Sequence, residues 1–239
     1  MNTESFTHEL NSRIAKYDLL SHPFYQSWSM GTLKNDEIKE YACDYYHHVA
    51  EFPNYLDTLQ KRLPEGELRN VVLENKDDEE GGQARDGRSH AELWLDFAQG
   101  MGASADDIVD HEPIDEIAQL IATFKDVVKN GSTAEALAAL YAYESQVPRV
   151  ATEKERGLKD HYGADDKTSY YFTLHKSFDV LHSKTWLEQI AREVGADETV
   201  QQAALNAAER AAKSLWNALD GVERERLSMA NGGAQVCCH

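Results

Sequence analysis

Apolar side chains recur every three or four residues along nearly the whole chain, which is the spacing of one face of an α-helix. The pattern is clearest after Asn35, a residue type that caps helices, and continues to about residue 62, where Leu63-Pro64 ends it. No segment shows the alternation of Val, Ile and Thr between turn residues that indicates a strand. The chain is therefore predicted to be all-α, a single bundle of seven or more helices.

Glycine, proline and capping residues divide this pattern into separate helices. Gly81-Gly82 and Asp86-Gly87 predict an irregular loop, and Pro148 is expected to kink or restart the helix that carries it. Residues 22–30 form a short aromatic stretch. The predicted helices cover residues 3–17, 36–62, 66–80, 90–99, 104–110, 113–129, 133 to about 160 with a break at Pro148, 166–194, and 197–226.

No linker rich in proline, glycine or serine divides the 239 residues, so we predict one helical domain over residues 1–228 and a flexible tail over 229–239. The formal net charge of −18 opposes a nucleic acid or an anionic membrane as a partner. No apolar run has the length of about 18–20 residues that a membrane span needs. The N-terminus lacks the apolar segment of a signal peptide and the three cysteines form no disulfide framework, so a cytoplasmic location is expected.

The sharpest chemical motif is His175, Asp179 and His182, spaced i, i+4 and i+7 within a predicted helix. This spacing places the three side chains on one stripe about two turns long. Helical bundles present metal ligands in this way, and two imidazoles with a carboxylate suit iron, manganese or zinc. The alternative is a polar helix face that carries two incidental histidines.

A second candidate ligand is Glu144, which follows the apolar run AEALAALYAY. Leu137, Leu140 and Tyr141 precede it by seven, four and three residues, so Glu144 shares their apolar stripe. A carboxylate buried there would be costly unless it is paired or binds a metal. The alternative is a Glu144 that points to solvent.

A third candidate segment is the acidic run at residues 77–80, followed by His90 at the start of an aromatic helix. With Glu144 and the histidine stripe, it supplies enough ligands for two metals bridged by carboxylates. One arrangement groups Glu144 with His175, and the 79–90 segment with His182, but spacing alone leaves the partition open. His47 and His48 either line the site or serve as polar core residues.

Five stretches of the chain together resemble one family, the haem-oxygenase-like proteins that include the chlamydial protein associating with death domains. More distant relatives are pyrroloquinoline-quinone synthase C and thiaminase-II type proteins. The similarity spans about residues 1–220, and its motifs YESQVP and H-x3-D-x2-H are specific to the branch with two metals. The stretches are HPFYQSW (22–28), DYYHHVAEFPNYL (44–56), HAELW (90–94), LYAYESQVPRVATEKERGL (140–158) and HKSFDVLHSKTW (175–186).

The resemblance implies a seven-helix haem-oxygenase-like bundle with a non-haem dimetal centre, either Fe/Fe or Mn/Fe. The first ligand pair departs from the family pattern, in which a Glu precedes the His by seven residues. Gln83 occupies that position here, and alignment of the acidic run gives Glu79, eleven residues before His90, with Glu80 as the alternative. The implied ligands are Glu79, His90, Glu144, His175, Asp179 and His182.

The chlamydial relative is understood to make para-aminobenzoate for folate synthesis from its own tyrosine, with a lysine as the amino donor and dioxygen activated at the metals. The matching positions here are Tyr25 and Lys154. Without the resemblance, Tyr25 reads as an aromatic core residue and Lys154 as a solvated helix charge. Tyr143, and either Tyr170 or Tyr171, lie near ligands in sequence and are candidates to pass an electron between the metals and Tyr25, with Tyr171 taken as the second candidate.

Two other functions stay open at this stage. The same dimetal site could oxidise a diffusible small molecule, in which case Tyr25 and Lys154 would be dispensable. An interaction module is the third alternative, although no segment indicates a partner surface. Beyond dioxygen and a small-molecule reductant, the expected partners do not include a nucleic acid or a membrane, and a homodimer is left open.

Overall fold

The computed structural model describes residues 1–82, 84 and 87–232, with all side chains in these ranges except those of residues 177–181 and 230–232. Within this part, the chain forms eleven α-helices and no strand, which confirms the all-α prediction. A 3-10 turn, η1 (Leu19–Ser21), and a π-helical segment, η2 (Asp78–Gly82), join them. The helices are α1 (Thr3–Ala15), α2 (Pro23–Ser29), α3 (Asn35–Gln60), α4 (Glu67–Asp77), α5 (His90–Gly100), α6 (Ala105–Val109), α7 (Asp115–Asn130), α8 (Thr133–Glu144), α9 (Val147–His161), α10 (Asp166–Val194) and α11 (Glu198–Gly232).

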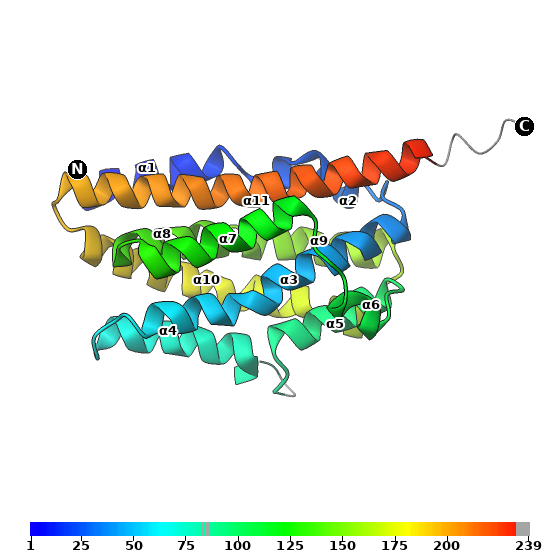
Figure 1. Cartoon of the computed structure of the whole chain (residues 1–239), viewed down its shortest axis with the longest axis horizontal. Coiled ribbons are helices and arrows are strands. Elements are labelled where there is room, and N and C mark those ends of the chain that lie inside the picture. Colours follow the sequence, from blue (N-terminus) through cyan, green and yellow to red (C-terminus); the bar gives the residue numbers. More distant parts are fainter. Residues whose placement is uncertain (83, 85–86, 233–239) are drawn as a thin grey trace, which may run out of the picture.

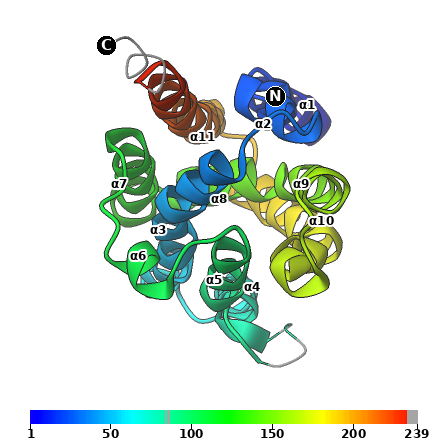
Figure 2. The same ribbon diagram turned by 90° about the vertical axis from the view of Figure 1, so that its right-hand side faces the viewer.

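The long helices pack in layers, with α1, α2 and α11 on one side of the bundle and α4 and α5 on the other (Figure 1). Between these layers lie α3, α7, α8, α9 and α10. Viewed along the bundle, α8 occupies the middle and is surrounded by the others (Figure 2). It packs against α11, α10, α7 and α9.

Helix α8 is central because its sequence is apolar on every side, and a helix without a polar face is stable only when it is enclosed. Nine of its twelve residues are buried, among them Glu144, its last residue. Gln146 then begins the next turn, and Pro148 lies in the first turn of α9, where its missing N–H is tolerated. The predicted break at Pro148 therefore separates two helices and leaves Glu144 at the end of a buried one.

Helix α2 is held against α9 by Trp28, whose indole N–H donates to the Lys154 carbonyl at 3.2 Å. Gly157 permits this approach, because a Cβ at that position would lie 2.7 Å from Trp28 Cδ1. At the other end, His22 caps the helix by accepting from the Phe24 N–H. These contacts fix the position of Tyr25 relative to Lys154.

The described end of the chain differs from the predicted tail. Helix α11 continues to Gly232, beyond residue 228, and residues 233–239 lie outside the described part. Among the described helices, none combines the length and apolar character required to cross a membrane.

Candidate metal centre and adjoining cavity

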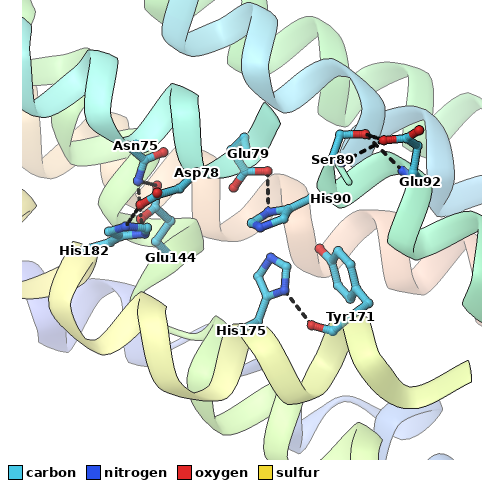
Figure 3. A network of polar contacts seen from close by, with 10 residues as sticks. All are labelled: Asn75, Asp78, Glu79, Ser89, His90, Glu92, Glu144, Tyr171, His175 and His182. Carbon is cyan, nitrogen blue, oxygen red and sulfur yellow. Dashed lines mark hydrogen bonds and ion pairs between the residues drawn. The ribbon is translucent and has the colours of Figure 1, made fainter. Parts of the chain in front are cut away.

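Two groups of histidines and carboxylates lie next to each other where η2 meets α5, α8 and α10 (Figure 3). Consecutive residues of η2 serve the two groups, Glu79 in one and Asp78 in the other. Their polar atoms are mostly enclosed, and Glu144 is only 3% exposed. A polar cluster at this depth needs internal partners or a bound cation to be stable.

The first group consists of Glu79, His90 and His175, and their candidate ligand atoms all lie within 4.8 Å of one another. Glu79 Oε2 lies 2.7 Å from His90 Nδ1. Burial opposes ionisation of Glu79, but His90, and beyond it His175 and His182, outweigh this effect and hold the pKa of the carboxyl below its ordinary value. The group thus offers one carboxylate and two imidazoles, a donor set that suits iron or manganese.

His175 is oriented by the backbone of its own helix. Its Nδ1 lies 2.7 Å from the Tyr171 carbonyl oxygen, and a carbonyl can only accept, so Nδ1 carries the proton. The lone pair is then on Nε2. A histidine that donates one ring N–H to a carbonyl and turns the other nitrogen inward has the arrangement found at protein metal sites.

The second group contains Asp78, Glu144, His182 and Asn75. His182 Nε2 lies 2.9 Å from Asp78 Oδ2, and His182 Nδ1 lies 3.8 Å from Glu144 Oε2. The Asn75 amide donates to both oxygens of Glu144 at 3.3 Å, which orients the carboxylate toward His182. Asp179, the third candidate ligand predicted on α10, is among the residues whose side chains lie outside the described part.

Gly81 explains why Glu79 and His90 meet although they are eleven residues apart. Its φ of 115° turns the chain out of η2, and a Cβ there would lie 2.4 Å from the Gly87 carbonyl oxygen. The chain therefore leaves the helical segment at the end of η2, and the described residues between there and His90, residues 84 and 87–89, are not helical. Glu80, the alternative ligand, pairs instead with Lys76 at 2.5 Å, with half of its side chain exposed.

The grouping differs from the arrangement considered from the sequence. His175 lies with Glu79 and His90, whereas His182 lies with Glu144. Sequence reasoning included Asp78 only as part of the acidic run 77–80 and did not single out Asn75. The available signal was spacing, because Asn75 precedes Asp78 by three residues and Glu79 by four, and each separation places a pair on one helical face.

A small cavity of about 30 Å³ lies beside the first group. It is lined by four residues that the sequence had marked, which come from α2, α8, α9 and α10: Tyr25, Tyr143, Lys154 and Tyr171. Tyr171 joins the cavity to the ligand groups, because its ring centroid lies 4.0 Å from that of His175. Tyr143 directly precedes Glu144 in the chain.

Lys154 is 5% exposed, so the view of it as a solvated helix charge is wrong. Its Nζ lies 4.5 Å from the Tyr25 ring centroid and donates to the Tyr41 hydroxyl. Burial holds the pKa of Lys154 well below its usual range, which favours the neutral amine. Burial likewise raises the pKa of Tyr25, whose hydroxyl lies 3.0 Å from that of Tyr41.

Tyr41 is a site residue that the sequence did not reveal, because its spacing on α3 is also that of an ordinary core residue. It contacts both the candidate amine and the candidate phenol. His48, also on α3, is fully enclosed by aromatic rings, with the Tyr143 centroid 5.2 Å away. It belongs to the wall behind Tyr143 and not to either ligand group.

Comparison with known proteins agrees with this geometry. Residues 39–216 match a family described as iron-containing redox enzymes. A 4-aminobenzoate synthase of Chlamydia pneumoniae is 36% identical over 210 residues, which cover 88% of this chain and 91% of that protein. A 4-aminobenzoate synthase of Nitrosomonas europaea is 36% identical over 233 residues, covering 93% and 92%.

The fold also has a close counterpart among solved structures. A TenA homologue from Pseudomonas syringae superimposes with a TM-score of 0.80 at 17% identity, covering 94% of this chain and 96% of that one. This likeness concerns the fold alone, whereas the family match and the 36% identities cover most of the sequence. The chain therefore belongs to the haem-oxygenase-like family of iron-containing redox enzymes.

Proposed function

We propose that this protein is an oxygen-dependent dimetal oxidase that forms 4-aminobenzoate, a folate precursor, from its own Tyr25 with Lys154 as the nitrogen donor. The observation that carries the proposal is that the Lys154 amine lies 4.5 Å from the Tyr25 ring centroid in a small cavity beside the candidate metal ligands. The 4-aminobenzoate synthases that are 36% identical support the identity of the product.

The metal ions would be held by nitrogen and oxygen donors from four elements. Glu79, His90 and His175 would hold one ion, and Glu144 and His182, joined by Asp179, the other. This donor set suits Fe/Fe and Mn/Fe equally. When bound, the two ions supply the capacity to bind and reduce dioxygen. The buried surroundings keep water away from the oxidising chemistry.

Lys154 is prepared for a role as nucleophile by its burial. A lysine acts as a nucleophile only as the neutral amine, and the lowered pKa of Lys154 favours that form at neutral pH. Its Nζ already faces the Tyr25 ring. Tyr41 lies between the amine and the Tyr25 hydroxyl, so it can relay a proton between them.

Aromatic rings connect the ligand groups to Tyr25. The Tyr171 ring contacts the His175 ring on one side and the Trp94 ring on the other, with centroids 4.9 Å apart. From Trp94 the series continues through Tyr45 and Tyr41, with centroid separations of 5.5 Å and 5.4 Å, to Tyr25 at 6.2 Å. Oxidation of Tyr25 requires loss of an electron and of the phenolic proton, since burial raises the pKa of Tyr25 and keeps the phenol protonated.

The structure of 4-aminobenzoate shows which atoms the chain must supply and which of its bonds must break. Its ring and carboxyl carbon correspond to the tyrosine ring and Cβ, so the Cα–Cβ bond of Tyr25 must break and Cβ must be oxidised. Its amino group would come from Lys154 Nζ, so a C–N bond forms at the ring carbon that bears the phenolic oxygen, this oxygen leaves as water, and the Cε–Nζ bond of Lys154 breaks. Dioxygen is the oxidant, and a small-molecule reductant is the further partner we propose. Each chain would react once.

The size of the cavity favours this internal source over a diffusible substrate. A volume of about 30 Å³ has room for a water or a dioxygen molecule, whereas pockets for organic ligands are on the order of 300 Å³ or more. A free amino acid would require the walls to move apart. The residues that already line the cavity need no such movement.

Isotope labelling tests the proposal directly. We would produce the chain with ring-¹³C tyrosine and ε-¹⁵N lysine, load it with iron, add dioxygen and ascorbate, and analyse the products by mass spectrometry. The expected result is 4-aminobenzoate that carries both labels, together with peptides altered at residues 25 and 154. Unlabelled product, made only when unlabelled tyrosine is supplied in solution, would contradict it. Metal-free protein treated in the same way is the control.

A further inference from the structure

One side chain of the second ligand group, Asp78, is assigned no role by the family pattern. It lies in η2, directly before Glu79, and its Oδ2 is 2.9 Å from His182 Nε2. The other ring nitrogen of His182 faces Glu144 at 3.8 Å. His182 thus lies between two carboxylates, and only one of them belongs to the implied ligand set (Figure 3).

We propose that Asp78 is a positioning residue for the second metal: it accepts the Nε2 proton of His182 and so directs the Nδ1 lone pair toward the ion shared with Glu144. This inference rests on the metal centre proposed above. A separation of 3.8 Å between Nδ1 and Oε2 matches two donors on one ion, since metal–ligand bonds of about 2.0–2.2 Å allow separations up to about 4.4 Å. The shorter contact, to Asp78, is a hydrogen-bond distance.

The contact differs from an ordinary surface ion pair in its burial and in its surroundings. The side chains of Asp78 and His182 are 13% and 16% exposed, respectively. Asn75, one turn earlier, fixes the second carboxylate by donating to both oxygens of Glu144. One face of α4 and η2 therefore orients both described donors of the second position.

Asp78 and Glu79 are adjacent in η2, and successive side chains of a helical turn point in different directions. Asp78 therefore reaches His182 on α10, while Glu79 reaches His90 on α5. A carboxylate that accepts from a ligating histidine fixes its orientation and raises its basicity, and loss of such a partner weakens metal affinity about 10–100-fold.

The test uses zinc as a redox-inactive probe of the full-length chain. Zinc uptake by the wild type, Asp78→Ala and Asp78→Asn would be followed in chelator-buffered titrations, and the ring ¹⁵N shifts of His182 would be recorded on the zinc-loaded proteins. Asp77→Asn is the matched control, because Asp77 is the exposed neighbour in the same acidic run. Circular dichroism of the metal-free variants checks folding.

We expect the wild type to bind two zinc ions, with zinc on Nδ1 and the proton on Nε2 of His182. Asp78→Ala should weaken one ion about 10–100-fold and leave the other unchanged. Asp78→Asn should weaken the same ion less, because the amide oxygen still accepts, and it keeps the test valid if the alanine variant does not fold. Asp77→Asn should match the wild type.

Two results would overturn the assignment while leaving the metal centre intact: zinc on Nε2 of His182 in the wild type, or unchanged affinity for both ions in both Asp78 variants. A wild type that takes up neither zinc nor iron is a different outcome. It would refute the proposed metal centre itself, and with it the role of Asp78.

Discussion

The two ligand groups and the adjoining cavity are built from different chemistry although Tyr171 touches both. In the ligand groups, Glu79 faces His90 and Asp78 faces His182, and the pKa of Glu79 is held low. In the cavity, the Lys154 amine donates to the Tyr41 hydroxyl and lies against aromatic rings, and burial alone lowers the pKa of Lys154. One region favours charged groups and the other favours neutral ones.

This difference separates two tasks that interfere with each other. Metal cations need anionic ligands. In the ligand groups, the buried carboxylates are stabilised by the imidazoles that face them. A lysine must stay neutral to act as a nucleophile, and a nearby carboxylate would keep it protonated. Placing an aromatic wall between the regions allows both conditions to hold in one buried interior.

Replacement of Lys154 should have the largest effect, because it should abolish product formation and leave metal binding unchanged. Lys154→Met keeps the shape of the side chain but removes the proposed nitrogen donor, so 4-aminobenzoate should fall to the limit of detection. Iron content should stay at the wild-type level, because Lys154 contacts none of the candidate ligands in the described part of the chain. Product by mass spectrometry and iron by atomic emission are the measurements.

Lys159→Met is the matched control, since Lys159 lies on the same helix and pairs with Glu155 and Asp166 near the surface. It should make product at the wild-type level. Full product from Lys154→Met would mean that the amine of the cavity is not the nitrogen source. Loss of iron together with product would mean that the two regions are not separable.

A substitution at Tyr171 tests whether this residue connects the ligand groups to the cavity. Tyr171→Phe keeps the ring against His175 but removes the hydroxyl, so oxidation through this residue should slow by about tenfold or more, equal to about 1.4 kcal/mol in activation free energy. Iron affinity should not change, because His175 is oriented by the backbone carbonyl of residue 171, which the variant retains. Single-turnover product formation and iron titration measure the two effects.

Tyr46→Phe serves as the control for this variant, since Tyr46 is only partly buried, contacts the His47 ring and does not line the cavity. It should react at the wild-type rate. A normal rate for Tyr171→Phe would contradict electron transfer through Tyr171. Tyr143, which also lines the cavity and directly precedes a candidate ligand, would then be the candidate for that role.

Local signals in the sequence were sufficient for most of the fold. The apolar period, a cap at Asp165 or Asp166 and a stop at Gly195 predict a helix over residues 166–194, and α10 has these bounds, with Asp165 as its cap. Pro148 predicted the division between α8 and α9. The short α2 was harder, because seven residues are too few to show a helical period.

The site was less predictable because its contacts join distant segments. Spacing could mark His175 and Glu144, but it could not decide which carboxylate faces which histidine across a loop that turns at Gly81. Tyr41 has the spacing of a core residue, and only packing shows that it contacts Lys154. The burial of Lys154 itself depends on α2, α3 and α10 closing over α9, which no local pattern encodes.

Glu155 offers the smallest and most specific test, because it directly follows Lys154 yet keeps its charge. Burial opposes its ionisation, but hydrogen bonds from Lys176, Lys159 and Thr173 outweigh this and lower the pKa of the carboxyl to about 2. A depressed pKa in the folded state means stability that is present above the unfolded value of 4.5 and is lost as the pH falls toward 2. Of these two neighbours on α9, Lys154 is thus neutral like the other groups of the cavity, whereas Glu155 is charged.

Glu155→Gln should therefore lower the free energy of unfolding at pH 7 by about 2 kcal/mol, a value reduced for the partial exposure of both lysines. The difference from the wild type should shrink at pH 4 and further at pH 3, as measured by urea unfolding. Glu153→Gln, a change on the same helix at a half-buried residue whose ion pair with Arg156 is open to solvent, should show little difference at any of these pH values. A Glu155→Gln penalty that does not depend on pH would show that packing, and not the charge, holds this residue. In that case Glu155 would not serve as the charged counterpart of the neutral Lys154.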